Sequence, residues 1–257
     1  MARSSVAGSF VCGFALLASL PLSSQVPKAP SLASPVPPVR PLAELISSPR
    51  GSEVERLLVA GRWEEARAGA QSLLLAELSQ DEAGPTTAAA DFALLALAKA
   101  GLGDTTGAIC RWHAAQAFDP DFLGADLAAY GDAGRMLEDH PLEDLAKRKE
   151  GPPSRVGGEV SRPELVSQRR PEYSPAARKA RVQGVVILEA VIGKDGKVSQ
   201  ARVLKGLPLG LSAAAIDAVC DWRFKPAATD DGPVEAFYIL TVNFQLDVRP
   251  QVPIPAQ

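Results

Sequence analysis

The chain has 257 residues, of which 46% are hydrophobic, 22% charged and 5% aromatic, and its formal net charge is −3. This length fits one or two modest domains, and a charge so close to zero gives no global reason to expect nucleic acid as a partner. The 22 prolines and 21 glycines indicate that the ordered part is shorter than the chain.

The N-terminus has the pattern of an export signal. Arg3 supplies a positive charge, and the uncharged apolar run at residues 6–20 precedes a short polar stretch. The run is short for a membrane-spanning helix, which needs roughly 20 residues, and no clean small-x-small pair marks a cleavage site. Residues 1–24 are therefore predicted to be either a cleaved signal peptide or a short retained anchor.

Two regions of different composition follow. Residues 25–50 contain seven prolines and few charges, which favours an extended linker that is either a spacer from a membrane or an unstructured leader. Residues 51–140 carry apolar residues at the three–four spacing typical of helices, with interruptions at residues 60–62 and at Gly103. This second region is predicted to be a set of helical hairpins.

Small residues recur in the helical region at positions where two helices must approach closely. Ala98, Ala108 and Ala115 show this pattern, and Ala66 in "GRWEEA" takes the same position as Ala108 in "GDTTGA". The region thereby resembles the tetratricopeptide repeat family, in which a helix–turn–helix unit of about 34 residues recurs. One regular unit and one irregular unit are marginal for a solenoid, so a small bundle of helical hairpins is the alternative.

Cysteine and histidine give no sign of a metal or catalytic site. Cys12 lies in the signal, while Cys110 and Cys220 lie in two distant helical patterns. These two are expected to be small buried hydrophobic residues, with a disulfide between them as the alternative in an oxidising compartment. His113 is expected to be structural. Since no zinc spacing, phosphate loop or catalytic triad pattern stands out, the chain is predicted to be no enzyme and to need no cofactor.

The residues after a second linker at 141–156 predict a small α+β module with the element order α-β-β-α-β. Pro175 after Ser174 begins a short helix, and Gly196 lies in a hairpin turn between two alternating strands. A second helix and a last strand follow. The strand at residues 234–246 alternates without a break, which predicts a three-stranded antiparallel sheet with one face covered by the helix.

Four motifs of this module together resemble the C-terminal domain of the TonB family: "PEYSPAARKARVQG", "VILEAVIGKDGKV", "AAIDAVCDWRFKPA" and "FYILTVNFQL". The resemblance implies a location in the periplasm of a Gram-negative cell. It also implies that a short segment of an outer-membrane transporter is added as a strand beside the last sheet strand. In that family an inner-membrane motor complex acts on the N-terminal anchor. Here residues 1–24 contain no histidine, whereas the family's anchor typically carries one.

A free sheet edge presents unpaired backbone groups that a peptide can complete. We therefore expect a partner segment of a transporter, or of another envelope protein, to bind along the last strand. The predicted partner-binding residues are its outward side chains: Glu235, Phe237, Ile239, Thr241, Asn243 and Gln245. A covered edge within a homodimer is the alternative.

Two functions remain open at this point. If residues 1–24 are retained, the chain is an energy transducer tethered to the inner membrane and linked to outer-membrane uptake. If they are cleaved, it is a soluble periplasmic scaffold or adaptor with no energy coupling. The predicted segments are 1–24 signal or anchor, 25–50 linker, 51–140 helical domain, 141–156 linker, 157–248 TonB-like domain and 249–257 tail.

Overall fold

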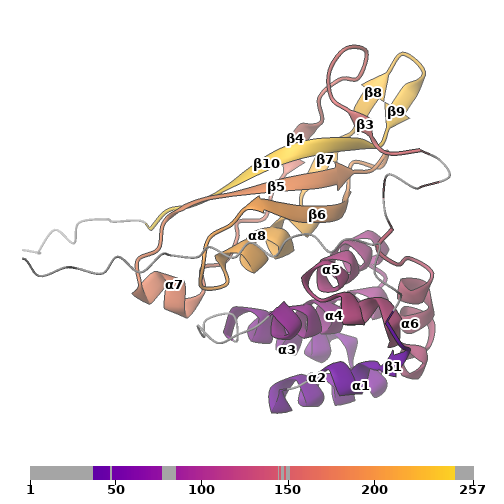
Figure 1. Ribbon diagram of the computed structural model, residues 1–257, viewed down its shortest axis with the longest axis vertical. Helices are drawn as coiled ribbons and strands as arrows, with labels where there is room; N and C mark the ends of the chain where they lie inside the picture. Colours follow the sequence, from indigo (N-terminus) through magenta and orange to yellow (C-terminus); the bar gives the residue numbers. More distant parts are fainter. Residues whose placement is uncertain are drawn as a thin grey trace, which may run out of the picture.

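The computed structural model describes residues 37–46, 48–76, 85–143, 145, 148 and 151–246. The predicted signal segment and C-terminal tail lie outside these residues. Within them the chain is α+β: a helical region is followed by a strand-rich module, and the two lie against each other (Figure 1). Among the described helices, none is both long enough and apolar enough to cross a membrane.

The helical region begins with short elements and continues with five longer helices. Its elements in chain order are β1 (Arg40–Pro41), α1 (Leu42–Leu45), α2 (Pro49–Val59), α3 (Trp63–Ala76), α4 (Pro85–Gly101), α5 (Thr105–Phe118), η2 (Pro120–Gly124), β2 (Ala125–Asp126), η3 (Ala128–Tyr130) and α6 (Gly131–Glu138). From α2 to α5 each helix packs against the next. Whether these hairpins are tetratricopeptide repeats stays a prediction.

The helix breaks follow local chemistry. Gly61 adopts a left-handed φ of 69° between α2 and α3, and the Asp104 side chain caps α5 by accepting a hydrogen bond from the backbone N–H of Gly107. The ordered region begins earlier than predicted, because Leu42 and Leu45 are buried in the core. The end of the predicted proline-rich linker is therefore part of the fold.

The strand-rich module contains the predicted α-β-β-α-β order with additional short strands. Its elements are β3 (Ser154–Arg155), β4 (Glu164–Ser167), α7 (Pro175–Lys179), β5 (Gly184–Ile192), β6 (Val198–Lys205), α8 (Leu211–Cys220), β7 (Arg223–Lys225), β8 (Ala227–Thr229), β9 (Gly232–Val234) and β10 (Ala236–Phe244). The short strands pair β4 with β7 and β8 with β9.

The prediction of a three-stranded antiparallel sheet was wrong. The main sheet has four strands in the order β3-β10-β5-β6, and β3 pairs in parallel with the start of β10. The additional strand comes from the predicted 141–156 linker. Its two residues are too few to show a periodic pattern, so sequence periodicity could not reveal it.

The core of the module lies between the inner face of the sheet and α8, as the alternating pattern predicted. Leu188, Leu240 and Val242 are buried on that face, and nearly all of α8 is buried. The turn between β5 and β6 requires glycine at Gly196, whose φ is 76°. A Cβ there would lie 1.8 Å from the carbonyl oxygen of Phe224.

The helical region is joined to the module by a disulfide between Cys110 in α5 and Cys220 in α8. Both cysteines are buried, as expected, but the interpretation as two separate hydrophobic residues was wrong. Packing of α5 against α8 brings their Cα atoms to 5.7 Å across 110 residues of sequence, and that distance is typical of disulfides.

We expect Trp222→Ala to destabilise the chain by about 3 kcal/mol. The Trp222 side chain is only 6% exposed, and its indole N–H donates to the carbonyl oxygen of Arg169 at 2.9 Å. Urea denaturation would measure the loss. Trp222→Phe, which keeps most of the apolar surface and loses the hydrogen bond, should cost about 1 kcal/mol. A loss below about 1 kcal/mol for the alanine variant would contradict burial of this residue.

Candidate functional site

The helical region covers one edge of the main sheet. Helix α5 packs against β6, and the Nδ1 atom of His113 lies 3.0 Å from the carbonyl oxygen of Ser199 in that strand. The other ring nitrogen, Nε2, lies 3.2 Å from the carbonyl oxygen of His140. His113 is half-buried between these two acceptors, which fits the structural role expected for it. A partner strand therefore has no open access to this part of the β6 edge.

The opposite edge, formed by β10, is covered only at its start. Strand β3 pairs with Ala236 and Phe237, whereas β5 pairs with β10 along its whole length on the other side. From Tyr238 to Phe244, no strand within the described parts of the chain pairs with this outer edge. We call this stretch the free edge.

The register shows which backbone groups face the free edge. The N–H of Ser154 donates to the carbonyl oxygen of Glu235 at 2.8 Å, so the backbone of Glu235 points to the β3 side. Alternate residues of a strand direct their backbone groups to the same side. The N–H and C=O groups of Ile239, Thr241 and Asn243 therefore face the free edge, while those of Val242 face β5.

The six predicted partner-binding residues divide into two groups. Glu235 and Phe237 are already in contact with other parts of the chain. The Glu235 carboxylate lies 2.7 Å from the Arg148 guanidinium. The Arg155 guanidinium lies over the half-buried Phe237 ring, 5.4 Å from the ring centroid. The other four are exposed along the strand and its end: Ile239, Thr241, Asn243 and Gln245.

A groove with a volume of about 390 Å³ adjoins the free edge. One wall is the end of β10, and the other is the extended segment 168–173, which includes Arg169, Arg170 and Tyr173. Sequence reasoning did not assign this segment to the site. The available signal was the pair of arginines directly before Pro171, in a stretch with no helical or strand periodicity.

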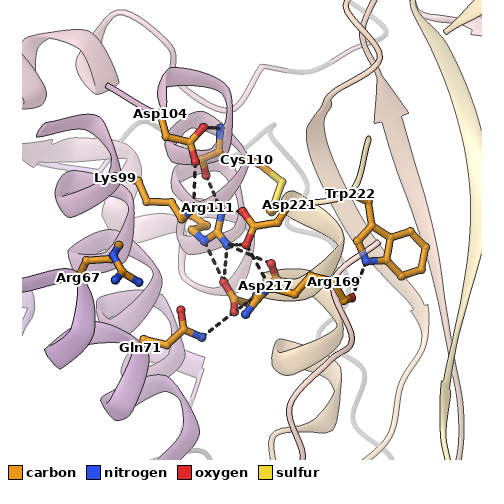
Figure 2. A network of polar contacts seen from close by, with 12 residues as sticks. Arg67, Gln71, Lys99, Asp104, Cys110, Arg111, Arg169, Asp217, Asp221 and Trp222 are labelled. Carbon is orange, nitrogen blue, oxygen red and sulfur yellow. Dashed lines mark hydrogen bonds and ion pairs between the residues drawn. A yellow bond between two sulfur atoms is a disulfide. The ribbon is translucent and has the colours of Figure 1, made fainter. Parts of the chain in front are cut away.

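Arg169 connects the groove wall to a network of charged residues (Figure 2). Its guanidinium forms ion pairs with Asp217 and Asp221, which lie four residues apart and therefore on one side of α8 and its end. The side chain of Asp221 also lies 3.1 Å from the Lys99 ammonium. Gln71 donates to Asp217 at 2.8 Å.

The same two aspartates hold Arg111, which comes from α5 in the helical region. Arg111 is fully buried, and its Nη2 atom lies 2.7 Å from Asp217 Oδ1 and 3.0 Å from Asp221 Oδ2. A buried guanidinium requires such compensation, because its desolvation is costly. The network therefore ties α5, α8 and the groove wall together.

The charges set the protonation of Asp217. Burial by itself would raise the pKa of this carboxyl, but the Arg111 and Arg169 guanidinium groups lower its pKa to about 2. For Arg111, burial would lower the pKa, and the Asp217 and Asp221 carboxylates raise it above its usual value. Both partners therefore stay ionised at neutral pH.

The low pKa of Asp217 predicts a loss of stability in acid. The folded-state pKa of about 2 lies below the unfolded value near 4. Above pH 4 the carboxylate therefore contributes about 2 kcal/mol to the free energy of unfolding, and this contribution is lost as the pH falls through 2. Asp217→Asn lacks this titration. In urea denaturation, the stability difference between the chain and this variant should shrink from pH 5 to pH 2. A difference that is constant over this range would contradict the assignment.

The free edge and the adjoining groove offer groups that can bind a ligand. In the residues that the structure describes, no cluster of three or more His, Cys, Asp or Glu side chains is arranged to hold a metal ion. The free edge presents backbone donors and acceptors, exposed side chains and an adjoining groove.

Comparison with known proteins agrees with the sequence resemblance. Residues 169–246 match the family model described as "Gram-negative bacterial TonB protein C-terminal". "Protein TonB" of Vibrio cholerae serotype O1 is 30% identical over 90 residues, which cover 34% of this chain and 37% of that relative. The matched family segment begins at Arg169 and includes the groove wall, Asp217 and all of β10.

These matches indicate a TonB-like protein of the cell envelope. The chain spans well under half the length of this curated relative, and the helical region lies in front of the matched family segment. The predicted resemblance is confirmed for the C-terminal module, so residues 169–246 are a domain of the TonB C-terminal family.

Proposed function

We propose that this chain is a periplasmic binding protein that takes up a segment of an outer-membrane transporter, or of another envelope protein, as a strand on the free edge of β10. The observation that carries the proposal is the row of edge-facing backbone groups at Ile239, Thr241 and Asn243, next to a groove of about 390 Å³. Main-chain hydrogen bonds would provide affinity, and the exposed side chains would provide specificity.

Coverage of the other edge supports the same choice. A peptide can add only where backbone groups are unpaired and accessible. Helix α5 packs against β6, and β3 covers the start of β10. The docking residues that we propose are thus the exposed members of the predicted set: Ile239, Thr241, Asn243 and Gln245.

A matched pair of proline variants tests the docking edge. We expect Thr241→Pro to weaken peptide binding at least about tenfold and to leave the fold intact, because it deletes an N–H donor that only the partner uses. Val242→Pro should unfold the module, because that N–H faces β5 within the sheet. Binding would be measured by calorimetry with the full chain and synthetic ten-residue peptides from the periplasm-facing segments of the same organism's outer-membrane transporters.

Thr241→Val is the control, since it keeps the backbone donor and should change the affinity by less than about twofold. Normal binding by a folded Thr241→Pro variant would remove β10 as the docking edge. The helical region would then be the better candidate for partner contact.

A periplasmic adaptor without energy coupling is the second candidate. The disulfide and the buried Arg111 network favour it, because they fix a folded helical region to the domain, where the energy-transducing members of the family carry a long proline-rich spacer. Energy transduction further requires a retained N-terminal anchor. Membrane fractionation with N-terminal sequencing separates the two: retention of residues 1–24 in the inner-membrane fraction supports transduction, and a cleaved soluble chain supports the adaptor.

A further inference from the structure

Strand β3 occupies part of the edge on which the partner is proposed to bind. It comes from the connection between the helical region and the domain, and it runs parallel to β10. The N–H of Ser154 donates a hydrogen bond to the carbonyl oxygen of Glu235. Glu235 and Phe237 lie in the same row of edge-facing backbone groups as Ile239 and Thr241. A partner strand that extended along the whole of β10 would need the groups that β3 now uses.

Two side-chain contacts hold this segment in place. Arg148 pairs with Glu235 at 2.7 Å, and both side chains are only about a quarter exposed or less, at 22% and 25%. The Arg155 guanidinium lies over the Phe237 ring, 5.4 Å from its centroid, within the range of a cation–π interaction. These contacts account for the positions of the two predicted partner-binding residues that are not open to a partner.

The attachment is nevertheless small compared with the rest of the sheet. Strand β3 has two residues paired with β10, whereas β5 pairs with all nine residues of β10. Neither β3 residue belongs to the buried core. Elements with few buried apolar contacts are the ones that open locally while the core stays folded. Detachment of β3 would therefore expose Glu235 and Phe237 and leave the core of the sheet in place.

We propose that β3 is an internal competitor for the docking edge: it covers Glu235 and Phe237 in the free chain and is displaced by a partner strand long enough to pair with them. This inference rests on the proposed function. Segments that pair only with the free edge bind without displacing β3. Longer segments displace it, release Arg148 from Glu235 and free the connection to α6.

Detaching β3 by mutation tests the competition. Ser154→Pro deletes the N–H that donates to Glu235, and Ser154→Ala keeps it. With the transporter peptides described above, Ser154→Pro should bind about three- to tenfold more tightly than the unmodified chain, the effect of one or two weak contacts. Ser154→Ala should bind like the unmodified chain. Arg148→Ala should also bind more tightly, while Arg162→Ala, which alters an exposed arginine nearby, should not.

Amide hydrogen exchange gives a second readout on the unmodified chain. The amide of Ser154 should be protected in the free chain and should exchange faster once the peptide is bound. If a peptide long enough to pair with Phe237 binds, Ser154 stays protected and neither Ser154→Pro nor Arg148→Ala changes the affinity, then β3 is a fixed strand and the inference is wrong. If no peptide binds to the chain or to any variant, the proposed function itself fails, which is a different result.

Discussion

Replacing Arg111 by methionine is expected to lower the free energy of unfolding by about 3–5 kcal/mol. Arg111 has no exposed surface, and it is the residue of the helical region that contacts both Asp217 and Asp221. Without Arg111 the buried Asp217 carboxylate keeps its contacts with Gln71 and with Arg169, which is partly exposed, but it loses the fully buried guanidinium. Removing one partner of a buried pair leaves a charge that is poorly compensated in a medium of low polarity.

Two further variants separate this explanation from a general loss of packing. The double variant Arg111→Met/Asp217→Leu removes both charges, so it should recover much of the stability that the single variant loses. Arg135→Met removes an arginine whose ion pair with Asp132 lies on the surface, at 68% and 96% side-chain exposure, and should change stability by less than about 0.5 kcal/mol. Urea denaturation measures all three. A double variant that is less stable than Arg111→Met would contradict the buried-charge explanation.

The alternating pattern of residues 234–246 correctly predicted the buried side chains Ala236, Leu240, Val242 and Phe244 and the exposed side chains Ile239, Thr241, Asn243 and Gln245. It could not predict the neighbours of the strand, because a period of two residues fixes faces and not partners. The predicted partner-binding residues therefore included Glu235 and Phe237, which the structure places in contact with Arg148 and Arg155 of the predicted 141–156 linker. The coverage of the β6 edge by α5 was also beyond the sequence, since it depends on how two regions pack.

The charged network was missed for a related reason. A single arginine in a helical pattern usually lies on the solvated side, and nothing near Arg111 in the sequence indicates its partner. Asp217 lies 106 residues away. In the sequence it is a polar residue within the mostly apolar helix "LSAAAIDAVC". Asp217 lies outside the stripe of apolar residues that predicts the inner side of this helix, so the pattern did not mark it as buried.

Loss of the Cys110–Cys220 disulfide is expected to lower stability by about 4 kcal/mol. The bond joins residues 110 apart in sequence, and closing a loop of about 100 residues in the unfolded chain removes entropy worth roughly 4–5 kcal/mol in the chain-entropy description. The bond also positions the charged network, because Arg111 follows Cys110 and Asp221 follows Cys220. Cys110→Ala/Cys220→Ala and chemical reduction should therefore have similar effects on urea denaturation.

Coupling to the network provides the sharper test of this role. If the disulfide holds α5 and α8 at the distance that the ion pairs require, its loss and Arg111→Met act on one interface, and their combined effect should be smaller than the sum of the two by 0.5 kcal/mol or more. The double cysteine variant is the control for reduction, because reductant should leave its denaturation midpoint unchanged. Strict additivity would mean that the bond stabilises only by constraining the unfolded chain. An unchanged midpoint of the unmodified chain in reductant would mean that the bond contributes no stability at all.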